Sequence, residues 1–397
     1  MKVSKLSLIS IITFLTLSVV FSISGSAQDS SAVQTQAVEA TAAEAGAEHV
    51  AAEPAHEEHA SGEEKLNAGK LIMEHIADSH GWHLWGHTSI PLPVIVYNAQ
   101  RGLTVFSSAR FEHGHKAYEG YMLNEAGKIE AVNEMGEVDA HSATVNEEIT
   151  AATYDISITK NVCSIFITIA ILLLVFTSVA KMYTNKRKGL APTGLQNAVE
   201  PIIIFMRDDV IKASIGEKKY EKYVPYLLTL FFFIWINNLL GLIPIFPGGA
   251  NVTGNISVAL VLAVLTFIIT VVSGNKYYWQ HIFAMPGVPK GVLVLLTPIE
   301  ILGMFLRPFV LMIRLFANIA AGHIIALSFF CLIFIFGQES LYGTGGGLGV
   351  SPLSLVFTVF MAMLELLVAF LQAYVFTLLS SVYIGAAVEE HHHDDHH

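Results

Sequence analysis

Long apolar runs separated by short polar segments dominate the second half of the chain and predict five membrane-spanning helices. A spanning helix needs roughly 20 apolar residues to cross a hydrocarbon core about 30 Å thick. The runs cover residues 156–180, 224–246, 255–272, 298–336 and 353–388. The Gly-rich segment 337–350 predicts a turn outside the membrane between the last two runs. Residues 151–390 are therefore predicted to form an all-α polytopic membrane domain that ends in a long helical hairpin.

The fourth run carries charged side chains that are costly in lipid. Glu300, Arg307 and Arg314 repeat every seven residues. Asn318 lies one turn beyond Arg314, so a helix places all four side chains on one polar stripe. His323 lies about 180° round an ideal helix from Arg314 and is expected to face a different neighbour. A charge at the centre of a spanning helix costs roughly 2.5–3.5 kcal/mol on insertion scales, which indicates that these residues have a function.

The last run carries a second polar stripe, because Glu365 and Gln372 are seven residues apart. Antiparallel packing of the last two helices would bring His323 to the level of Glu365. Hydrogen bonding between helices is the alternative explanation for a polar stripe, and it carries most weight for the amide Asn237 in the second run. It accounts poorly for an arginine with a separate acid and imidazole, since intramembrane chains of acids and histidines usually mark proton paths.

The start of the chain is typical of an exported protein. Lys2 and Lys5 precede an apolar run over residues 6–23 and a group of small residues, so residues 1–27 are predicted to be a signal peptide, with an uncleaved anchor as the alternative. Residues 28–64 are acidic and Ala-rich without aromatic side chains, which predicts a disordered tether.

Residues 65–150 predict a small β-rich exported domain, because segments 90–97 and 103–106 read as strands around a turn. A second turn near residues 124–128 predicts another hairpin.

Histidines at the start of this domain raise the question of a metal. His80, His83 and His87 would lie on one face of a helix and are a low-ranking candidate zinc site. The favoured interpretation is an interfacial segment with Trp82 and Trp85 at headgroup level. No cofactor is expected, and neither is a disulfide, since both cysteines lie in apolar runs.

Composition indicates the class of protein, and the distribution of charge indicates its orientation in the membrane. With 53% hydrophobic and 14% charged residues, the chain falls among polytopic membrane proteins rather than soluble enzymes. The densest basic cluster, residues 181–188, follows the first span and places that end in the cytoplasm. The β-rich domain is then periplasmic, the protein lies in an inner membrane, and the C-terminus with its His-rich tail, residues 391–397, is cytoplasmic. The amphipathic segment 195–215 is expected along the cytoplasmic surface.

Several motifs together resemble one family. The segment 314–323, RLFANIAAGH, resembles the signature RLFGNxxAGE of the a subunit of rotary F-type ATP synthases. Glu300, fourteen residues before the arginine, matches the same family, as do segments 238–244 and 371–373. The resemblance covers about residues 150–390. Two departures are that His323 and Glu365 stand where bacterial relatives often have Glu and His, and that Gly241 replaces an acidic residue found in some relatives.

The resemblance implies a non-catalytic stator subunit beside a ring of c subunits, with a peripheral-stalk b subunit as a further partner, membrane lipids around it and no nucleic acid. It implies two aqueous half-channels and an essential arginine, here Arg314. The implied proton path contains Glu365, His323 and Glu300, with Asn318, Gln372 and Asn238 as supporting polar residues.

From the residues alone, a secondary transporter with a charged site at the midplane is the alternative, although no internal repeat is visible. The absence of the phosphate-binding motif GxxxxGK[ST] places ATP chemistry on another subunit. The sequence leaves proton and sodium both open, because the ion ligands would lie mostly on the ring.

Overall fold

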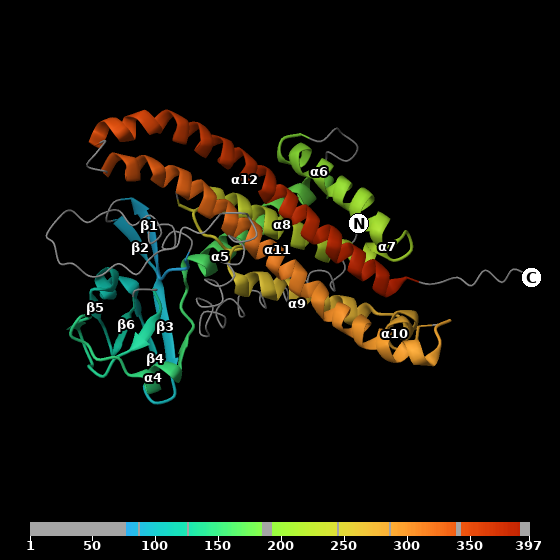
Figure 1. Ribbon diagram of the computed structural model, residues 1–397, viewed down its shortest axis with the longest axis horizontal. Coiled ribbons are helices and arrows are strands. Elements are labelled where there is room, and N and C mark those ends of the chain that lie inside the picture. The colour runs from blue at the N-terminus through green and yellow to red at the C-terminus, as the bar shows by residue number, and fades with distance from the viewer. Residues whose placement is uncertain are drawn as a thin grey trace, which may run out of the picture.

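A computed structural model describes most of the chain from residue 77 onward. The described residues are 77–85, 88–124, 127–184, 193–243, 246–285, 287–338 and 343–389. The predicted signal peptide, tether and His-rich tail lie outside them. Figure 1 shows a small β-rich part at one end and a bundle of long helices that occupies the rest of the molecule.

The β-rich part is built from short antiparallel pairs. β3 (Pro93–Asn98) lies between β4 (Gly102–Ser107) and β9 (Thr153–Asp155). The remaining pairs are β1 (Gly81–Trp85) with β2 (Thr88–Pro91), β5 (Lys116–Ala117) with β8 (Val138–Asp139), and β6 (Tyr121–Leu123) with β7 (Ile129–Ala131). A 3₁₀ segment (Ser108–Gly114) and α4 (Glu147–Ala151) complete this part.

The two predicted hairpins are confirmed, since β3 pairs with β4 and β6 pairs with β7. Alternate residues of β3 are buried, as a half-buried strand requires. Val94 and Val96 pack with Phe111, Tyr121 and Ala131 in a small core of their own.

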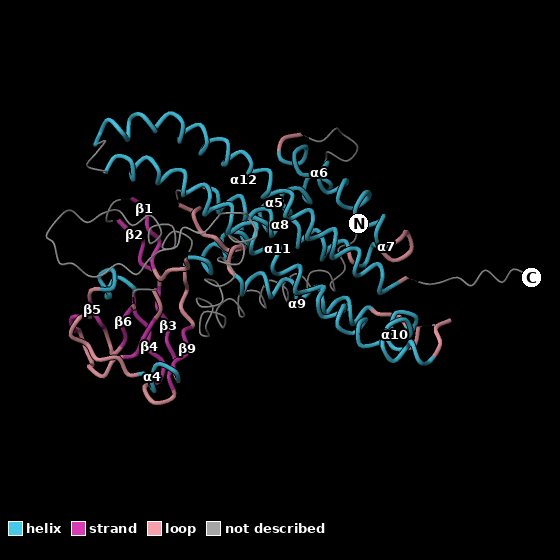
Figure 2. The backbone as a smooth tube through the Cα atoms, viewed as in Figure 1, coloured by secondary structure: helices cyan, strands magenta, loops and turns pink. Residues whose placement is uncertain are grey.

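The helical part contains five helices that are long and apolar enough to span a membrane, so the predicted fold class is confirmed. They are α5 (Lys160–Thr184), α8 (Val224–Leu242), α9 (Ile256–Ser273), α11 (Lys290–Gln338) and α12 (Gly343–Val388). Shorter helical segments are α6 (Leu195–Phe205), a π-helical stretch (Met206–Lys212), α7 (Ala213–Ile215), a 3₁₀ turn (Tyr220–Lys222) and α10 (Lys276–Phe283). α11 and α12 lie side by side as an extended hairpin (Figure 2).

The predicted turn over residues 337–350 is wrong in its second half, because α12 already begins at Gly343. The helix of the fourth run also begins earlier than predicted, at Lys290, and it continues through Pro298 and Pro308. Glycine and proline disfavour helix interiors by about 1 and 3 kcal/mol, but tertiary packing routinely overrides such local preferences. The long mutual contact of α11 and α12 is that packing.

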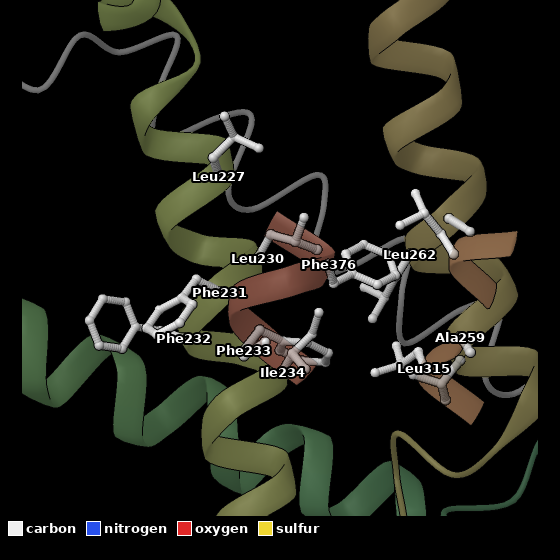
Figure 3. Close-up of a cluster of buried hydrophobic side chains, with 14 of the residues drawn as sticks. Leu227, Leu230, Phe231, Phe232, Phe233, Ile234, Ala259, Leu262, Leu315 and Phe376 are labelled. Carbon is white, nitrogen blue, oxygen red and sulfur yellow. The ribbon is translucent and has the colours of Figure 1, made fainter. Parts of the chain in front are cut away.

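The core of the bundle forms around α8. Figure 3 shows Phe233 and Ile234 of α8 on the side of that helix toward Leu262 of α9 and Phe376 of α12. In the most apolar window of α8, 56% of the residues are buried, against 11% in that of α12. A helix that is apolar all round is expected at the centre of a bundle. The outer faces of α11 and α12 are therefore apolar surfaces that no other described residue covers.

The β-rich part contacts the bundle through Trp82 of β1. Its side chain is 3% exposed, its Nε1 donates to the carbonyl of Gly248 at 3.0 Å, and its ring meets Phe246 edge-on at 5.2 Å. Trp82 is therefore covered by the loop between α8 and α9 and does not present its ring to lipid headgroups. The helix on which the low-ranking zinc site would depend does not form, since residues 81–85 are a strand.

Replacing Trp82 should loosen this junction. We expect Trp82→Ala to cost about 3–5 kcal/mol because it leaves a cavity, and Trp82→Phe to cost about 1 kcal/mol for the lost hydrogen bond. The measurement is the temperature at which the β-rich part of the full-length chain becomes protease-sensitive. Tyr154→Ala, at a side chain that is 61% exposed, is the control. A Trp82→Ala variant as resistant to protease as this control would show that Trp82 does not hold the β-rich part against the bundle.

Candidate functional site

His323 of α11 and Glu365 of α12 face each other inside the hairpin. Nδ1 of His323 lies 2.9 Å from Oε1 of Glu365, and the side chains are 14% and 9% exposed. The two atoms are close but not aligned for a hydrogen bond, and Oε1 has no hydrogen-bond partner among the described residues. A Cβ at Gly322 would lie 3.4 Å from the same oxygen, so Gly322 lies directly beside the pair. The predicted His323–Glu365 pair is confirmed.

Asn318 and Gln372 form a second polar link in the hairpin. Nδ2 of Asn318 donates to Oε1 of Gln372 at 2.8 Å. Gln372 is 3% exposed, and its Nε2 has no partner within the described part of the chain. Asn318 and His323 therefore both contact α12, although they lie far apart round the wheel of α11. The expectation that His323 faces a different neighbour holds for Arg314, which is exposed, but not for Asn318, because α12 contacts both Asn318 and His323.

Asn238 of α8 connects three elements. Its Nδ2 donates to the carbonyl of Ala369 in α12 at 3.0 Å, and its Oδ1 accepts from Thr253 at 2.5 Å. One turn further along α8, a Cβ at Gly241 would lie 3.8 Å from Nε2 of His323. Asn238 therefore belongs to the same neighbourhood as the His323–Glu365 pair.

Asn237 points to α5 instead. Its Oδ1 accepts from Thr168 at 3.0 Å, and its Nδ2 donates to the carbonyl of Phe233. Sequence reasoning missed both Thr168 and Thr253. Thr168 lies in a spanning helix, where a threonine hydroxyl usually bonds its own backbone, and Thr253 lies in the loop before α9, so neither residue differs from its surroundings in the sequence alone.

Arg314 lies on the outer face of the hairpin and is exposed. No hydrogen bond or ion pair joins its guanidinium to another residue in the described ranges. The surface around it is apolar: Phe309, Val310 and Ile313 of α11 are all exposed there. An arginine is thus presented on a surface otherwise suited to lipid or to another apolar protein.

Arg307 and Glu300 lie nearer the α10 end of α11 and are half-buried. The guanidinium of Arg307 sits 5.7 Å from the centre of the Tyr383 ring. Together with Tyr278 of α10 these side chains line a small cavity that Thr266 and Thr270 also border. Burial raises the pKa of the Tyr278 hydroxyl, Arg307 opposes this shift and Glu300 adds to it. The stripe is therefore divided between an exposed half at Arg314 and an enclosed half at Arg307.

His80 is the described member of the candidate zinc site. Its Nε2 lies 2.9 Å from Oδ2 of Asp155, and its Nδ1 lies 3.2 Å from the carbonyl of Gly127. Burial alone would lower the pKa of His80, but the hydrogen bond and charge of Asp155 outweigh burial and raise it. The His87 position and the His83 side chain lie outside the described parts, and those parts contain no group of three metal-ligating side chains.

Comparisons with known proteins divide the chain at the same place as the fold. A family model described as ATP synthase A chain matches residues 162–385, and one described as Domain of unknown function (DUF8433) matches residues 71–156. The limits of the two matches flank the connection between β9 and α5.

Curated relatives are similar over the helical part. ATP synthase subunit a of Chlorobium phaeobacteroides is 42% identical over 254 residues, 63% of this chain and 70% of that protein. The protein of the same name from Pelodictyon phaeoclathratiforme is 45% identical over 247 residues, 61% of this chain and 68% of that protein. ATP synthase subunit a 2 of Chlorobaculum tepidum is 47% identical over 249 residues, 61% of this chain and 66% of that protein.

The His323–Glu365 contact predicts an energetic coupling. His323→Leu leaves a buried carboxylate without its partner, so we expect this variant to melt at a lower temperature than the double variant His323→Leu/Glu365→Leu. The measurement is thermal unfolding of the detergent-solubilised full-length chain. Ser328→Ala, at an exposed hydroxyl that bonds only its own helix, is the control. Additive effects of the two single changes would show that the residues do not interact.

Proposed function

Because the chain belongs to the ATP synthase A chain family, we propose that Arg314 is the essential charge of an ion-conducting stator that faces a rotor ring. As a member of this family the chain is a proton-translocating subunit of the membrane sector and has no catalytic part in ATP chemistry. The observation that carries the proposal is the exposed guanidinium on the apolar outer face of α11.

A cation at this position would act on a carboxyl group carried by the ring. An ionised carboxylate in a low dielectric is prohibitively costly unless a positive charge stands beside it. Arg314 supplies that charge, so a ring carboxyl that passes it can give up its proton. A guanidinium stays protonated in proteins, so Arg314 does not carry the proton itself. The same fixed charge blocks direct passage of protons between the two sides.

Protons would reach and leave the ring by separate half-channels. On the outer side we assign the path to His323 and Glu365, with Asn238, Gln372 and Asn318 holding their surroundings. Its position is supported by the approach of Gly241 to His323, since Gly241 precedes the loop between α8 and α9. On the inner side we assign Glu300, which lies near the cavity at Arg307 and Tyr278. Each 100 mV of membrane potential supplies about 2.3 kcal/mol per charge that crosses.

The partners and the orientation follow from this assignment. The ring would cover the apolar face of α11 and α12 around Arg314, and the b subunit of the peripheral stalk would bind elsewhere on the bundle. The protein lies in a membrane, and we assign the β-rich part to the periplasmic side of an inner membrane and the end of α12 to the cytoplasm. The basic residues 181–188 at the end of α5 support this orientation.

The orientation is tested by cysteine labelling. In a background without Cys163 and Cys331, Met135→Cys should react with a membrane-impermeant maleimide in cells whose outer membrane alone is permeable. Lys218→Cys, between α7 and α8, should react only after the inner membrane is opened. Both positions are exposed, so folding does not hide them. The reverse pattern would overturn the assignment.

The role of Arg314 is tested by substitution. Arg314→Ala should reduce ATP-driven acidification of inverted vesicles to the background rate while the complex still assembles, because removing an unpaired charge from lipid does not penalise insertion. Arg314→Lys should also fail, since a strongly hydrated ammonium lacks the planar fork and can lose its proton when desolvated. Ile313→Ala, at the neighbouring exposed side chain, is the matched control and should pump normally. Normal pumping by Arg314→Ala would refute the proposed function.

A further inference from the structure

The first spanning helix carries a buried polar face that the proposed function does not use. Asn161, Ser164 and Thr168 are 2%, 0% and 0% exposed and recur at spacings of three and four residues along α5. On a helix this spacing places them on one side. The opposite side is apolar, since Phe166 is 47% exposed and Leu173 is 50% exposed. The polar face of α5 therefore points into the protein.

Two residues of this face carry polar atoms without protein partners. Oδ1 of Asn161 and Oγ of Ser164 are buried and have no hydrogen-bond partner among the described residues. Buried polar atoms are almost always satisfied, and internal water is the usual partner where protein groups do not reach. Hydrogen bonding between helices accounts for Thr168, which bonds Asn237, but not for Asn161 and Ser164.

The polar face leads toward the outer proton path. Thr168 bonds Asn237, the next residue along α8 is Asn238, and Gly241 one turn further lies beside His323. The described residues contain eight buried side-chain atoms without a hydrogen-bond partner. Three of them belong to residues at the two ends of this route, namely Asn161 and Ser164 on α5 and Glu365 beside His323.

A cluster of charged side chains lies at the outer end of the same face. Oδ1 of Asp78 accepts from the backbone N–H of Asn161 at 3.1 Å, and the carbonyl of Ser79 accepts from the N–H of Lys160 at 2.9 Å. The His80–Asp155 pair is close to Asp78, because the charges of Asp78 and His80 act on each other. Lys160 begins α5 and is the cation of the cluster. Burial raises the pKa of Asp78 above its ordinary value, although the hydrogen bond from Asn161 and the charge of Lys160 oppose this shift.

We propose that the polar face of α5, with Asp78, His80 and Asp155 above its first turn, is an outer entrance through which water and protons reach Asn237 and then the His323–Glu365 pair. This inference rests on the proposed proton-conducting function. It assigns to the β-rich part and α5 a share in collecting protons on the outer side.

Water access is tested without reference to transport. In a background without Cys163 and Cys331, Ser164→Cys changes one oxygen to sulfur and should fold. A small charged methanethiosulfonate added from the outer side should modify this cysteine about ten-fold or more faster than Phe166→Cys, because only a hydrated thiolate reacts. Equal rates at the two positions would overturn the proposal.

The same assembled complex then reports on transport. Modification of Ser164→Cys should lower the rate of proton-driven ATP synthesis several-fold, and reduction of the mixed disulfide should restore it. If modification leaves the rate of ATP synthesis unchanged, the polar face of α5 is not a proton entrance and the proposal is overturned. The two proposals fail in different ways. If the proposed function is wrong, Arg314→Ala still pumps, and the labelling rate of Ser164→Cys does not change.

The titratable cluster is tested through the outer pH. Asp78→Asn keeps an oxygen that can accept from Asn161 but removes the acidic group. We expect the rate of ATP synthesis to fall several-fold at alkaline outer pH, where protons are scarce, and to approach that of the unsubstituted protein at acid outer pH. An equal loss at both pH values would show that Asp78 only holds α5 in place.

Discussion

Every polar group at membrane depth needs a partner, and the way this chain meets that requirement determines its architecture. Asn318 with Gln372, His323 with Glu365, and Asn238 with the backbone of α12 are contacts across helices at this depth. Each contact ties α12 to another element. Arg314 is an exception of a different kind, because it is an exposed charge that no described residue of the chain neutralises.

This exception connects the packing to the proposed function. α8 is surrounded by its neighbours, whereas α11 and α12 leave apolar side chains exposed along one long face. Lipid could cover the apolar side chains but would not pair with a guanidinium. Under the proposed function, a rotating ring with a carboxyl group at the same depth would satisfy both parts of this surface. The exposed arginine would then be explained by a partner rather than by the fold of this chain alone.

Periodicity in the sequence was sufficient to predict the spans and the polar stripes. The five runs, the seven-residue spacing of Glu300, Arg307 and Arg314, and the His323–Glu365 pair all depend on helix geometry, which is regular. The limits of the last hairpin could not be predicted in this way, because Gly343 starts α12 despite its low helix propensity. Local helix propensity therefore does not determine where α12 begins.

Other features depend on contacts between distant segments. His80 was assigned to a helix with two other histidines, but its partner is Asp155, which lies 75 positions away. The polar face of α5 consists of ordinary Asn, Ser and Thr residues whose burial becomes apparent only when Thr168 meets Asn237. Trp82 was placed among lipid headgroups because the loop that covers it comes 166 positions later. The spacing of residues along the chain does not reveal contacts between segments that lie so far apart in the sequence.

The most direct test of the account is the identity of the molecule that covers Arg314. A photo-crosslinking amino acid at Ile313, in the otherwise unsubstituted complex, should form its main protein adduct with the ring subunit. The same amino acid at Phe166, exposed on α5, should not. Mass spectrometry of the adducts identifies the partner. Adducts of position 313 with lipid alone, in a complex that contains the ring, would contradict the claim that this face is the stator surface.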